Sequence, residues 1–360
     1  MAYTTIDDPS VYFQTALYTG DDSSALNVTN SGNSDLQPDW IWIKNRSDSC
    51  NHIIQDTSRG INVCFFPDDP AVEQTNSVFG HVNSVASDGF QVDRGNSGEL
   101  NANSNSKNYV AWQWKCNGGT TETAVDESGS NPANVRQTNT DAGFSIITYT
   151  GTGSAGTIAH GLGVIPDWVI IKGRDTATDG MVYHGANTSA PETDALTLPE
   201  NSATSDSADW WNDTAPTSSV FTLGTHDRVN TDGKLFIAYC FAEKQGYSKF
   251  GSYTGNANAD GTFVYTGFKP AWLMVKMTDS TNVWQIYDNK REPNNPNIKR
   301  LNAEVQTAES TSGSDRLDFL SNGFKMRATS GNVNSANDYV YMAFAESPFV
   351  SSKGVPTTAR

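Results

Sequence analysis

Apolar residues along the chain gather in short runs that are either continuous or alternate with polar residues. Three runs begin with a tryptophan and end with a lysine: WIWIK (40–44), WVIIK (168–172) and WLMVK (272–276). Three longer runs are rich in aromatic residues: 109–115, 236–243 and 340–346. Such runs, separated by turn dipeptides such as Asp88-Gly89, are typical of buried β-strands. No window has the 3.6-residue period of an amphipathic helix, so the pattern predicts an all-β protein.

The same features recur three times in the same order. A Tyr-Thr-Gly turn comes first, and it is followed by Pro-x-Trp, a phenylalanine near a turn and the aromatic-rich run. The tyrosines are Tyr18, Tyr149 and Tyr253, the prolines Pro38, Pro166 and Pro270, and the phenylalanines Phe90, Phe221 and Phe324. This order predicts three tandem β-sandwich repeats, jelly-roll-like and of roughly 100 residues each.

The repeats set the predicted domain limits. The first repeat with an N-terminal segment takes 1–117, the second 143–246 and the third 247–350. Between the first two lies 118–142, which is rich in Gly, Ser and Thr and is predicted to be a polar linker. Residues 351–360 are predicted to be an extended C-terminal tail that could add a strand to a neighbouring protein. The pattern leaves open whether the repeats form a rod or a compact cluster.

The Pro-x-Trp stretch itself reads as a strand of the scaffold. The proline cannot donate to a strand ladder, so it fits just before the strand begins. The tryptophan and the apolar residues enter the core, and the lysine is expected to end the strand at solvent. An aspartate follows the proline in two copies (Asp39 and Asp167) and an alanine in the third (Ala271). We expect these aspartates to bond backbone amides.

Composition narrows the range of partners. Charged residues make up 18 % of the chain and the formal net charge is −16. A surface this acidic repels phosphate backbones and anionic membranes, so we expect no nucleic-acid partner and no membrane insertion. The four cysteines form no CxxC pair, and the N-terminus lacks the basic and apolar regions of a signal peptide. Together these features predict synthesis in a reducing cytoplasm.

One charged loop follows the lysine in two of the copies. QDTSR contains Asp56 and Arg59, and YDNKR contains Asp288 and Arg291. A spacing of three residues suits an ion pair that closes a loop, which is the structural interpretation. The second copy has YHGAN there and lacks both charges. If a copy carries a polar contact site for a glycan or partner, this loop is a candidate.

Adjacent tryptophans in SADWWND, Trp210 and Trp211, form a second candidate contact for a glycan or a partner. They lie in a polar loop of the second copy that has no counterpart in the others. Exposed aromatic rings stack on sugars, and a loop can leave at least one of the two exposed. Packing over the end of their own sandwich is the alternative.

The residues nominate no catalytic, cofactor-binding or metal-ligating group. The five histidines are scattered, and neither HxH nor HExxH occurs. GTGSAG matches GxGxxG but is not followed by a helical pattern, which the nucleotide fingerprint requires. Acidic loops such as TGDDSS and FPDDPA leave calcium open as a ligand, without the spacing of a known calcium motif. The chain is therefore expected not to be an enzyme.

Several stretches resemble a family of virion structural proteins from tailed phages, especially marine ones. They are the opening MAYTTIDDPSVYFQTALYTG, the strand LQPDWIWIKNRS, the DTSRG after it and the ending AESPFVSSKGVPTTAR. Members of the family are described as tail-fibre-like or concanavalin/LamG-like. The resemblance implies β-sandwich modules on the surface of a virion and brings no catalytic residues that could be mapped onto this chain.

The expected function is accordingly that of a non-enzymatic virion protein: a tail fibre, fibre adaptor or receptor-binding component that presents loops to the host surface. One alternative is a capsid decoration (cement) protein, and another is a glycan-binding module or polysaccharide depolymerase. The expected partners are other virion proteins, further copies of the chain in a homo-oligomer, with a trimer as first guess, and a host surface glycan or receptor.

Overall fold

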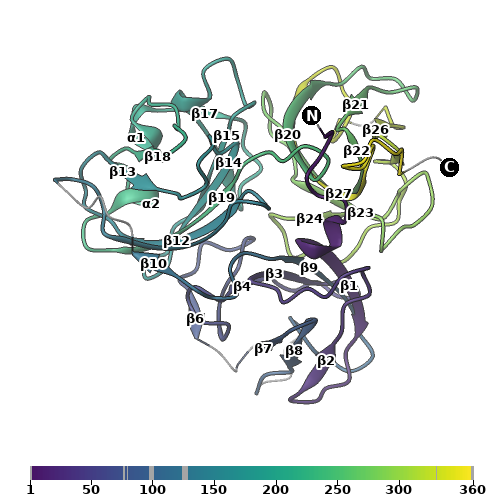
Figure 1. The fold of residues 1–360 in the computed structure, drawn as a ribbon, viewed down its shortest axis with the longest axis horizontal. Coiled ribbons are helices and arrows are strands. Elements are labelled where there is room, and N and C mark those ends of the chain that lie inside the picture. The colour runs from purple at the N-terminus through teal and green to yellow at the C-terminus, as the bar shows by residue number, and fades with distance from the viewer. Residues whose placement is uncertain are drawn as a thin grey trace.

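Strands and loops make up nearly all of the computed structural model, which describes residues 2–75, 78, 80–96, 101–123, 129–329 and 331–357. The sheets are antiparallel throughout, which confirms the all-β prediction. Among the described residues the helices are short: η1 (Pro9–Val11), η2 (Pro191–Thr193), α1 (Ala208–Trp211) and α2 (Asp227–Asn230). Figure 1 shows three lobes grouped around a common centre, which form a compact cluster rather than a rod.

The first lobe is built from two facing sheets. The larger sheet has the strand order β1 (Phe13–Thr19), β9 (Asn108–Trp114), β3 (Trp40–Asn45), β4 (Ile53–Asp56), β5 (Val63–Phe65) and β6 (Gln74–Thr75). The smaller sheet has the order β2 (Leu26–Val28), β8 (Gly89–Asp93) and β7 (His81–Ala86). Ile41, Val82 and Phe90 lie in the core of this lobe.

The second lobe has the same strand order, with two further strands added at one end. Its larger sheet runs β10 (Glu122–Thr123), β11 (Asn134–Asn139), β12 (Phe144–Thr150), β19 (Leu235–Phe241), β14 (Trp168–Gly173), β15 (Gly180–His184), β16 (Asp194–Leu198) and β17 (Ser205–Asp206). Its smaller sheet pairs β13 (Gly156–Ala159) with β18 (Val220–Leu223).

The third lobe repeats the order once more. Its larger sheet runs β20 (Ser248–Thr254), β27 (Asp338–Pro348), β22 (Phe268–Met277), β23 (Gln285–Asp288) and β24 (Leu301–Asn302). Its smaller sheet runs β21 (Phe263–Tyr265), β26 (Gly323–Met326) and β25 (Leu317–Leu320). Pro270 lies inside β22 at a bulge, the place within a sheet where a missing donor is tolerated.

Equivalent residues of the three lobes pair in equivalent ways. Each Pro-x-Trp tryptophan pairs with an aromatic residue of the later run: Trp40 with Trp114, Trp168 with Phe241 and Trp272 with Phe344. The tyrosines of the three Tyr-Thr-Gly turns stack on Tyr109, Phe236 and Tyr339 with ring centroids 5.0, 5.2 and 4.9 Å apart. These pairings give each position of one lobe a counterpart in the other two.

The continuous apolar runs exist because both faces of each larger sheet are covered. In β3, Ile41 and Ile43 enter the core of the first lobe, while Trp40 and Trp42 enter a core shared by all three lobes. At the centre of the shared core, Trp114 lies 6.4 Å from Phe241 and 5.4 Å from Phe344, and Phe241 lies 5.7 Å from Phe344. These three counterparts form a triangle, so the lobes are related by an approximate three-fold arrangement.

The predicted connecting segments carry structure of their own. The segment expected to be a linker, 118–142, contributes β10 and β11 to the second lobe, because β11 pairs with β12 along its whole length. The tail expected to be extended turns back in its described part, where Val350 bridges Pro356 and Ser352 donates to Asp7. The exact limits of the tandem domains stay a prediction.

Candidate functional site at the lobe junctions

The lysine that ends each Pro-x-Trp strand is buried, so the expectation that it ends the strand at solvent is wrong. Lys44, Lys172 and Lys276 are each at most 2 % exposed. Lys44 Nζ donates to Gln306 O of the third lobe at 2.8 Å. Lys172 Nζ donates to Pro70 O of the first lobe at 2.9 Å.

The third lysine completes a ring, because Lys276 Nζ donates to Asn201 O of the second lobe at 3.2 Å. Each lobe therefore holds the one before it in the same way, and the set closes on itself. Burial lowers the pKa of Lys172 and of Lys276 to about 8, since the charged ammonium loses water on entering the junction.

Asp56 and Arg59 form a buried ion pair at the junction of the first and second lobes. Arg59 Nε donates to Asp56 Oδ2 at 2.6 Å, and both side chains are fully buried. Tyr239 of the second lobe donates to the same carboxylate oxygen at 2.7 Å. Glu73 extends the network, with Arg59 at 3.4 Å and Arg174 of the second lobe at 2.9 Å. The sequence-predicted pair is real, but it holds two lobes together instead of facing solvent.

The second sequence-predicted pair occupies the equivalent place between the third and first lobes. Arg291 Nε donates to Asp288 Oδ2 at 2.5 Å, again with both side chains fully buried. Trp112 of the first lobe donates to this oxygen at 3.0 Å. Glu309 plays the part of Glu73, because it pairs with Arg291 at 3.1 Å and with Arg46 of the first lobe at 2.7 Å.

The junction of the second and third lobes uses different chemistry. His184 takes the strand position of the two aspartates, and Met342 takes that of Tyr239 and Trp112. A methionine cannot donate a hydrogen bond, so a carboxylate in this place would lack its partner. His184 Nε2 instead lies 3.1 Å from Tyr341 O, and burial lowers the pKa of the imidazole to about 4. The second copy therefore has no aspartate at this position because the third lobe offers a methionine there instead of a hydrogen-bond donor.

Two further carboxyl groups are buried. Asp68 accepts from His52 N at 3.0 Å, and Glu304 accepts from Trp284 N at 2.9 Å. Burial raises the pKa of each carboxyl to about 7. In the sequence, Asp68 stands out only as part of the acidic loop FPDDPA. No sequence signal marks Glu304 or the burial of either group, because both lie in loops whose residues differ between the copies.

The aspartates after the proline do bond backbone amides. Asp39 Oδ2 accepts from Cys116 N at 2.7 Å and from Gly118 N at 3.0 Å. Asp167 Oδ2 accepts from Glu243 N at 2.7 Å. In the third lobe the equivalent residue is Ala271, whose side chain has no atom that can accept such a bond.

The tryptophan pair does not offer an exposed stacking surface, which corrects the glycan-contact prediction. Trp210 is 7 % and Trp211 3 % exposed. The two residues end α1, where Trp211 Nε1 donates to Asp194 O at 2.9 Å and Trp210 lies 4.0 Å from the ring of His226. The bulk of both rings is used for packing within the second lobe.

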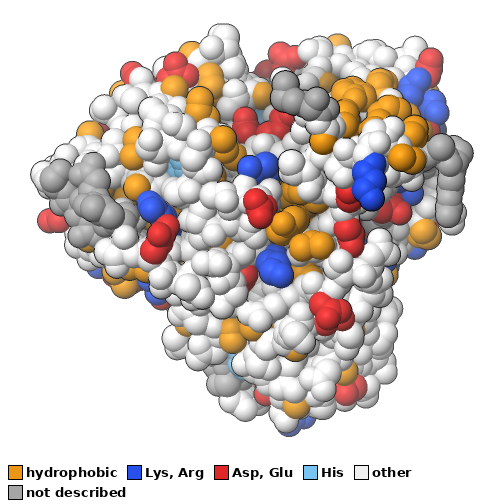
Figure 2. All heavy atoms as spheres, in the orientation of Figure 1, with side chains coloured by type: hydrophobic (Ala, Val, Ile, Leu, Met, Phe, Trp, Pro, Cys, Tyr) orange, Lys and Arg blue, Asp and Glu red, His pale blue; other side chains and the backbone are white. Residues whose placement is uncertain are grey.

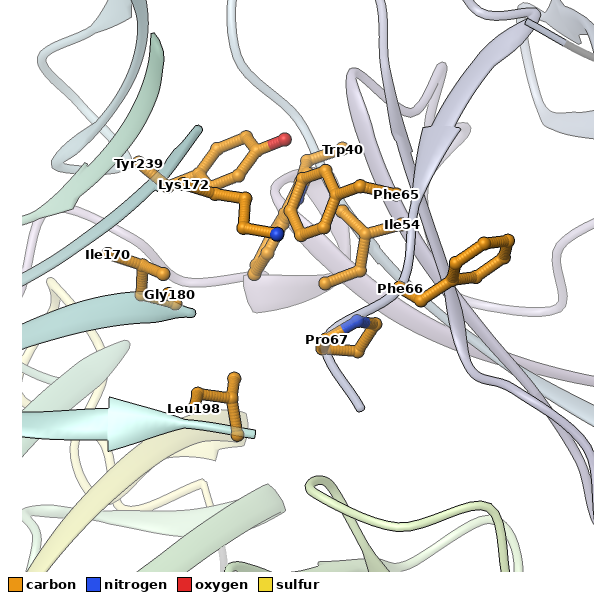
Figure 3. A pocket seen from close by; sticks show the side chains of 10 residues that line it. All are labelled: Trp40, Ile54, Phe65, Phe66, Pro67, Ile170, Lys172, Gly180, Leu198 and Tyr239. Atoms are coloured by element: carbon orange, nitrogen blue, oxygen red, sulfur yellow. The ribbon is translucent and has the colours of Figure 1, made fainter. Parts of the chain in front are cut away.

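Cavities of very different size lie at the junctions and beside them. Between the first and second lobes, Trp40, Phe65 and Tyr239 surround a space of about 10 Å³, and Lys172 reaches toward it (Figure 3). That is room for a single water. A polar cleft of about 640 Å³ opens on the third lobe, lined among others by Asn289, Glu292, Asn295 and Glu346.

The acidic loops considered for calcium are engaged in other contacts. In TGDDSS, Asp21 bonds Ser23 N at 2.9 Å and Asp22 pairs with Arg94 at 3.1 Å. Within the described residues, no cluster of three or more His, Cys, Asp or Glu side chains is arranged to hold a metal ion. The described part of the chain also has no helix long and apolar enough to cross a membrane.

Comparison with known proteins places the chain in a family. Residues 8–348 match the model of a domain of unknown function (DUF7483), and the chain belongs to that family. This one match spans all three lobes, in keeping with their shared core. Neither the search of curated proteins nor the search of solved structures returns a significant match.

Proposed function

We propose that the chain is a non-enzymatic structural protein of a tailed-phage particle, serving as a rigid three-lobed unit of a tail fibre, fibre adaptor or receptor-binding component. The main support is the use to which the recurring charged residues are put. The lysines and both Asp–Arg pairs are buried in contacts between lobes. Groups held in this way build a scaffold and leave function to the loops that differ between lobes.

The exterior of the molecule fits a presenting role. Figure 2 shows acidic and basic side chains scattered over one face, with apolar side chains gathered mainly over the third lobe. The net charge of −16 favours solubility at the high local concentration of an assembling particle. The resemblance of both termini and of the first Pro-x-Trp strand to phage virion proteins supplies the biological setting.

Quantitative mass spectrometry of purified virions tests this proposal. We expect the chain in the particle at the low copy number of a tail component, with antibody labelling at the tail. A copy number in the hundreds and labelling over the head would instead favour the decoration protein. Absence from purified virions would refute the proposal, and release of reducing ends from host polysaccharide would refute its non-enzymatic part.

A second candidate function, glycan binding, is favoured by the polar cleft of the third lobe. Amide and carboxylate side chains such as Asn289, Glu292 and Glu346 are suited to paired hydrogen bonds with sugar hydroxyls. We expect binding on a glycan array to be lost in Glu346→Ala and kept in Trp210→Phe. The reverse result would exclude the cleft as the contact.

Self-association into a trimer remains part of the proposal. Light scattering at several protein concentrations measures it directly. A mass equal to one chain at all concentrations would limit the three-fold arrangement to the lobes of a single chain.

A further inference from the structure

Strand β11 adds an edge strand to the second lobe, and the described residues of the other two lobes include no counterpart of it. It pairs with β12 from Asn134 opposite Tyr149 to Asn139 opposite Phe144. Its Gln137 is fully buried. Gln137 Nε2 donates to the hydroxyls of Thr57 at 2.9 Å and Ser58 at 2.7 Å, both in the first lobe. One added strand thus covers a sheet edge and fills a lobe junction with a neutral amide.

The equivalent edge in the first lobe is β1. Phe13 pairs with Trp114 in the first lobe as Phe144 pairs with Phe241 in the second. Two residues further along each strand, Thr15 is therefore the counterpart of Ile146. Ile146 is the residue that lies opposite Gln137 of β11. Among the described residues no strand pairs with the outer side of β1, and Figure 1 shows β1 at the margin of its sheet.

The backbone of β1 is oriented for a further strand. Lys115 N donates to Tyr12 O, and Gly20 N donates to Lys107 O. The even-numbered residues of β1 are therefore the ones whose backbone groups bond to β9. Because backbone groups alternate along a strand, Thr15, Leu17 and Thr19 direct theirs to the outer side. Leu17 is 42 % exposed, so the edge is open there.

A hollow lies beside this edge, where Gln137 lies in the second lobe. Its volume is about 170 Å³, more than ten times the roughly 10–15 Å³ that one water needs. Thr15 lines it together with Asn289 and Lys290, the counterparts of Thr57 and Ser58. Thr15 is 5 % exposed, and its Oγ1 has no hydrogen-bond partner within the described part of the chain. A buried hydroxyl without a partner is costly, so it points to a missing polar group.

At the remaining junction an aromatic side chain takes the corresponding place. Ser248 pairs with Phe344, which makes Phe250 the counterpart of Thr15. The ring of Phe250 lies 5.9 Å from that of Trp168 in the second lobe and occupies the place itself. Ala271 adds to the space at the open junction, since Asp39 and Asp167 hold that position in the other lobes.

We infer that the outer edge of β1 and the hollow beside Thr15 form a binding site for an extended segment of a partner chain. The segment adds an antiparallel strand to β1 and inserts a glutamine or asparagine side chain next to Thr15, as β11 does on β12. A neutral amide fits better than a charged group, because Lys290 and Glu346 both line the hollow and Glu346 already pairs with Lys269 at 2.6 Å. The inference stands on these contacts alone and does not need the proposed function.

A peptide with the sequence PANVRQTNT, residues 132–140 of the chain itself, is the probe. We expect it to bind the full chain saturably in calorimetry or NMR titration, and replacement of its glutamine by alanine to weaken binding about tenfold. Thr15→Phe, which copies Phe250, should abolish binding and leave the melting temperature equal or higher.

Proline substitutions locate the edge. Leu17→Pro removes an outward N–H without touching the bonds to β9, so it should abolish binding. Ser252→Pro makes the same change at the counterpart position of β20 and should leave binding unchanged. Circular dichroism of each variant establishes that it is folded.

Disulfide cross-linking tests for binding that is too weak to be measured by titration. In the second lobe Val135 lies opposite Thr148, and Thr148 is the counterpart of Leu17. A peptide with cysteine in place of its valine should therefore form a disulfide with the Leu17→Cys variant of the chain. It should form none with the Ser252→Cys variant. Absence of both binding and cross-linking would overturn the inference. So would binding that is insensitive to Thr15→Phe, because the peptide would then be displacing β11. A dimer of the chain that Thr15→Phe dissolves would replace the separate partner with a second copy.

Discussion

At the scale of single residues, the junctions are set by what each side chain meets in the next lobe. Asp56 meets the donor Tyr239 and Asp288 meets the donor Trp112, whereas His184 faces Met342 and bonds a backbone carbonyl instead. A buried carboxylate is stable only where several donors converge on it. The residue at this position of each lobe therefore varies together with the residue that faces it in the neighbouring lobe.

Asp68 provides a test at this scale. Folding raises the pKa of Asp68 from 3.8 to about 7, and its Oδ2 has no partner among the described residues. Between these values the folded state binds more protons than the unfolded state, so this contribution to stability is lost as the pH rises to about 7. Asp68→Asn cannot titrate and keeps an oxygen for His52 N.

We therefore expect the free energy of unfolding of Asp68→Asn, measured relative to that of the unchanged chain, to rise by on the order of 3 kcal/mol between pH 4 and pH 8. Denaturant unfolding at a series of pH values measures the difference. Asp213→Asn, the same substitution at an exposed position, is the control for the change of residue type. A flat difference for Asp68→Asn would contradict the raised pKa.

At the scale of elements, β11 shows how a polar segment becomes part of a sheet. Its sequence NVRQTN has no continuous apolar run, and pairing with β12 together with the burial of Gln137 helps to give it a fixed place. Propensity is a weak guide for such strands, because neighbouring strands decide what a strand position requires.

Gln137→Ala tests the contribution of this strand. The change removes bonds to Thr57 and Ser58 and leaves their junction partly unfilled, so we expect the free energy of unfolding to fall by about 2–3 kcal/mol. Val135→Ala, on the exposed side of the same strand, should lower it by less than about 0.5 kcal/mol. Chemical denaturation of both variants gives the comparison, and equal losses would show that Gln137 has no special part in the junction.

At the scale of the whole molecule, the shared aromatic core and the ring of lysines join three sandwiches into one unit. Each larger sheet buries one face in its own lobe and the other in the common core. A lobe removed from the others would expose that second face to water, which is unfavourable in proportion to its apolar area.

We consequently expect one cooperative unfolding transition for all three lobes. Asp288→Ala leaves Arg291 buried without its main partner and should lower the free energy of unfolding by about 3–5 kcal/mol, shifting the whole transition. The same substitution at the exposed ion pair of Asp260 with Lys325 should leave the free energy of unfolding nearly unchanged, because water screens that pair. Calorimetry and circular dichroism, followed together, would contradict this if either variant melted in two separate steps.

Much of the fold could be predicted from local pattern, and the site could be predicted only in part. Strands such as 40–44 were evident because aromatic and β-branched runs have few other uses in a chain of this composition. The spacing of Asp56 and Arg59 indicated an ion pair, which the structure contains. The burial of Trp210 and Trp211 was predicted only as one of two alternatives, and the strands in 118–142 were not predicted, because neither depends on nearby sequence.

The sequence by itself determined the strands, their repeated order and the residues that pair within a lobe, since period and residue type act over a few positions. The tertiary structure alone decided that the lysines are buried, that the charged pairs join lobes and that β1 keeps an open edge beside a hollow. These features depend on residues 75 or more positions apart, whose meeting is set by closure of the three lobes around one core.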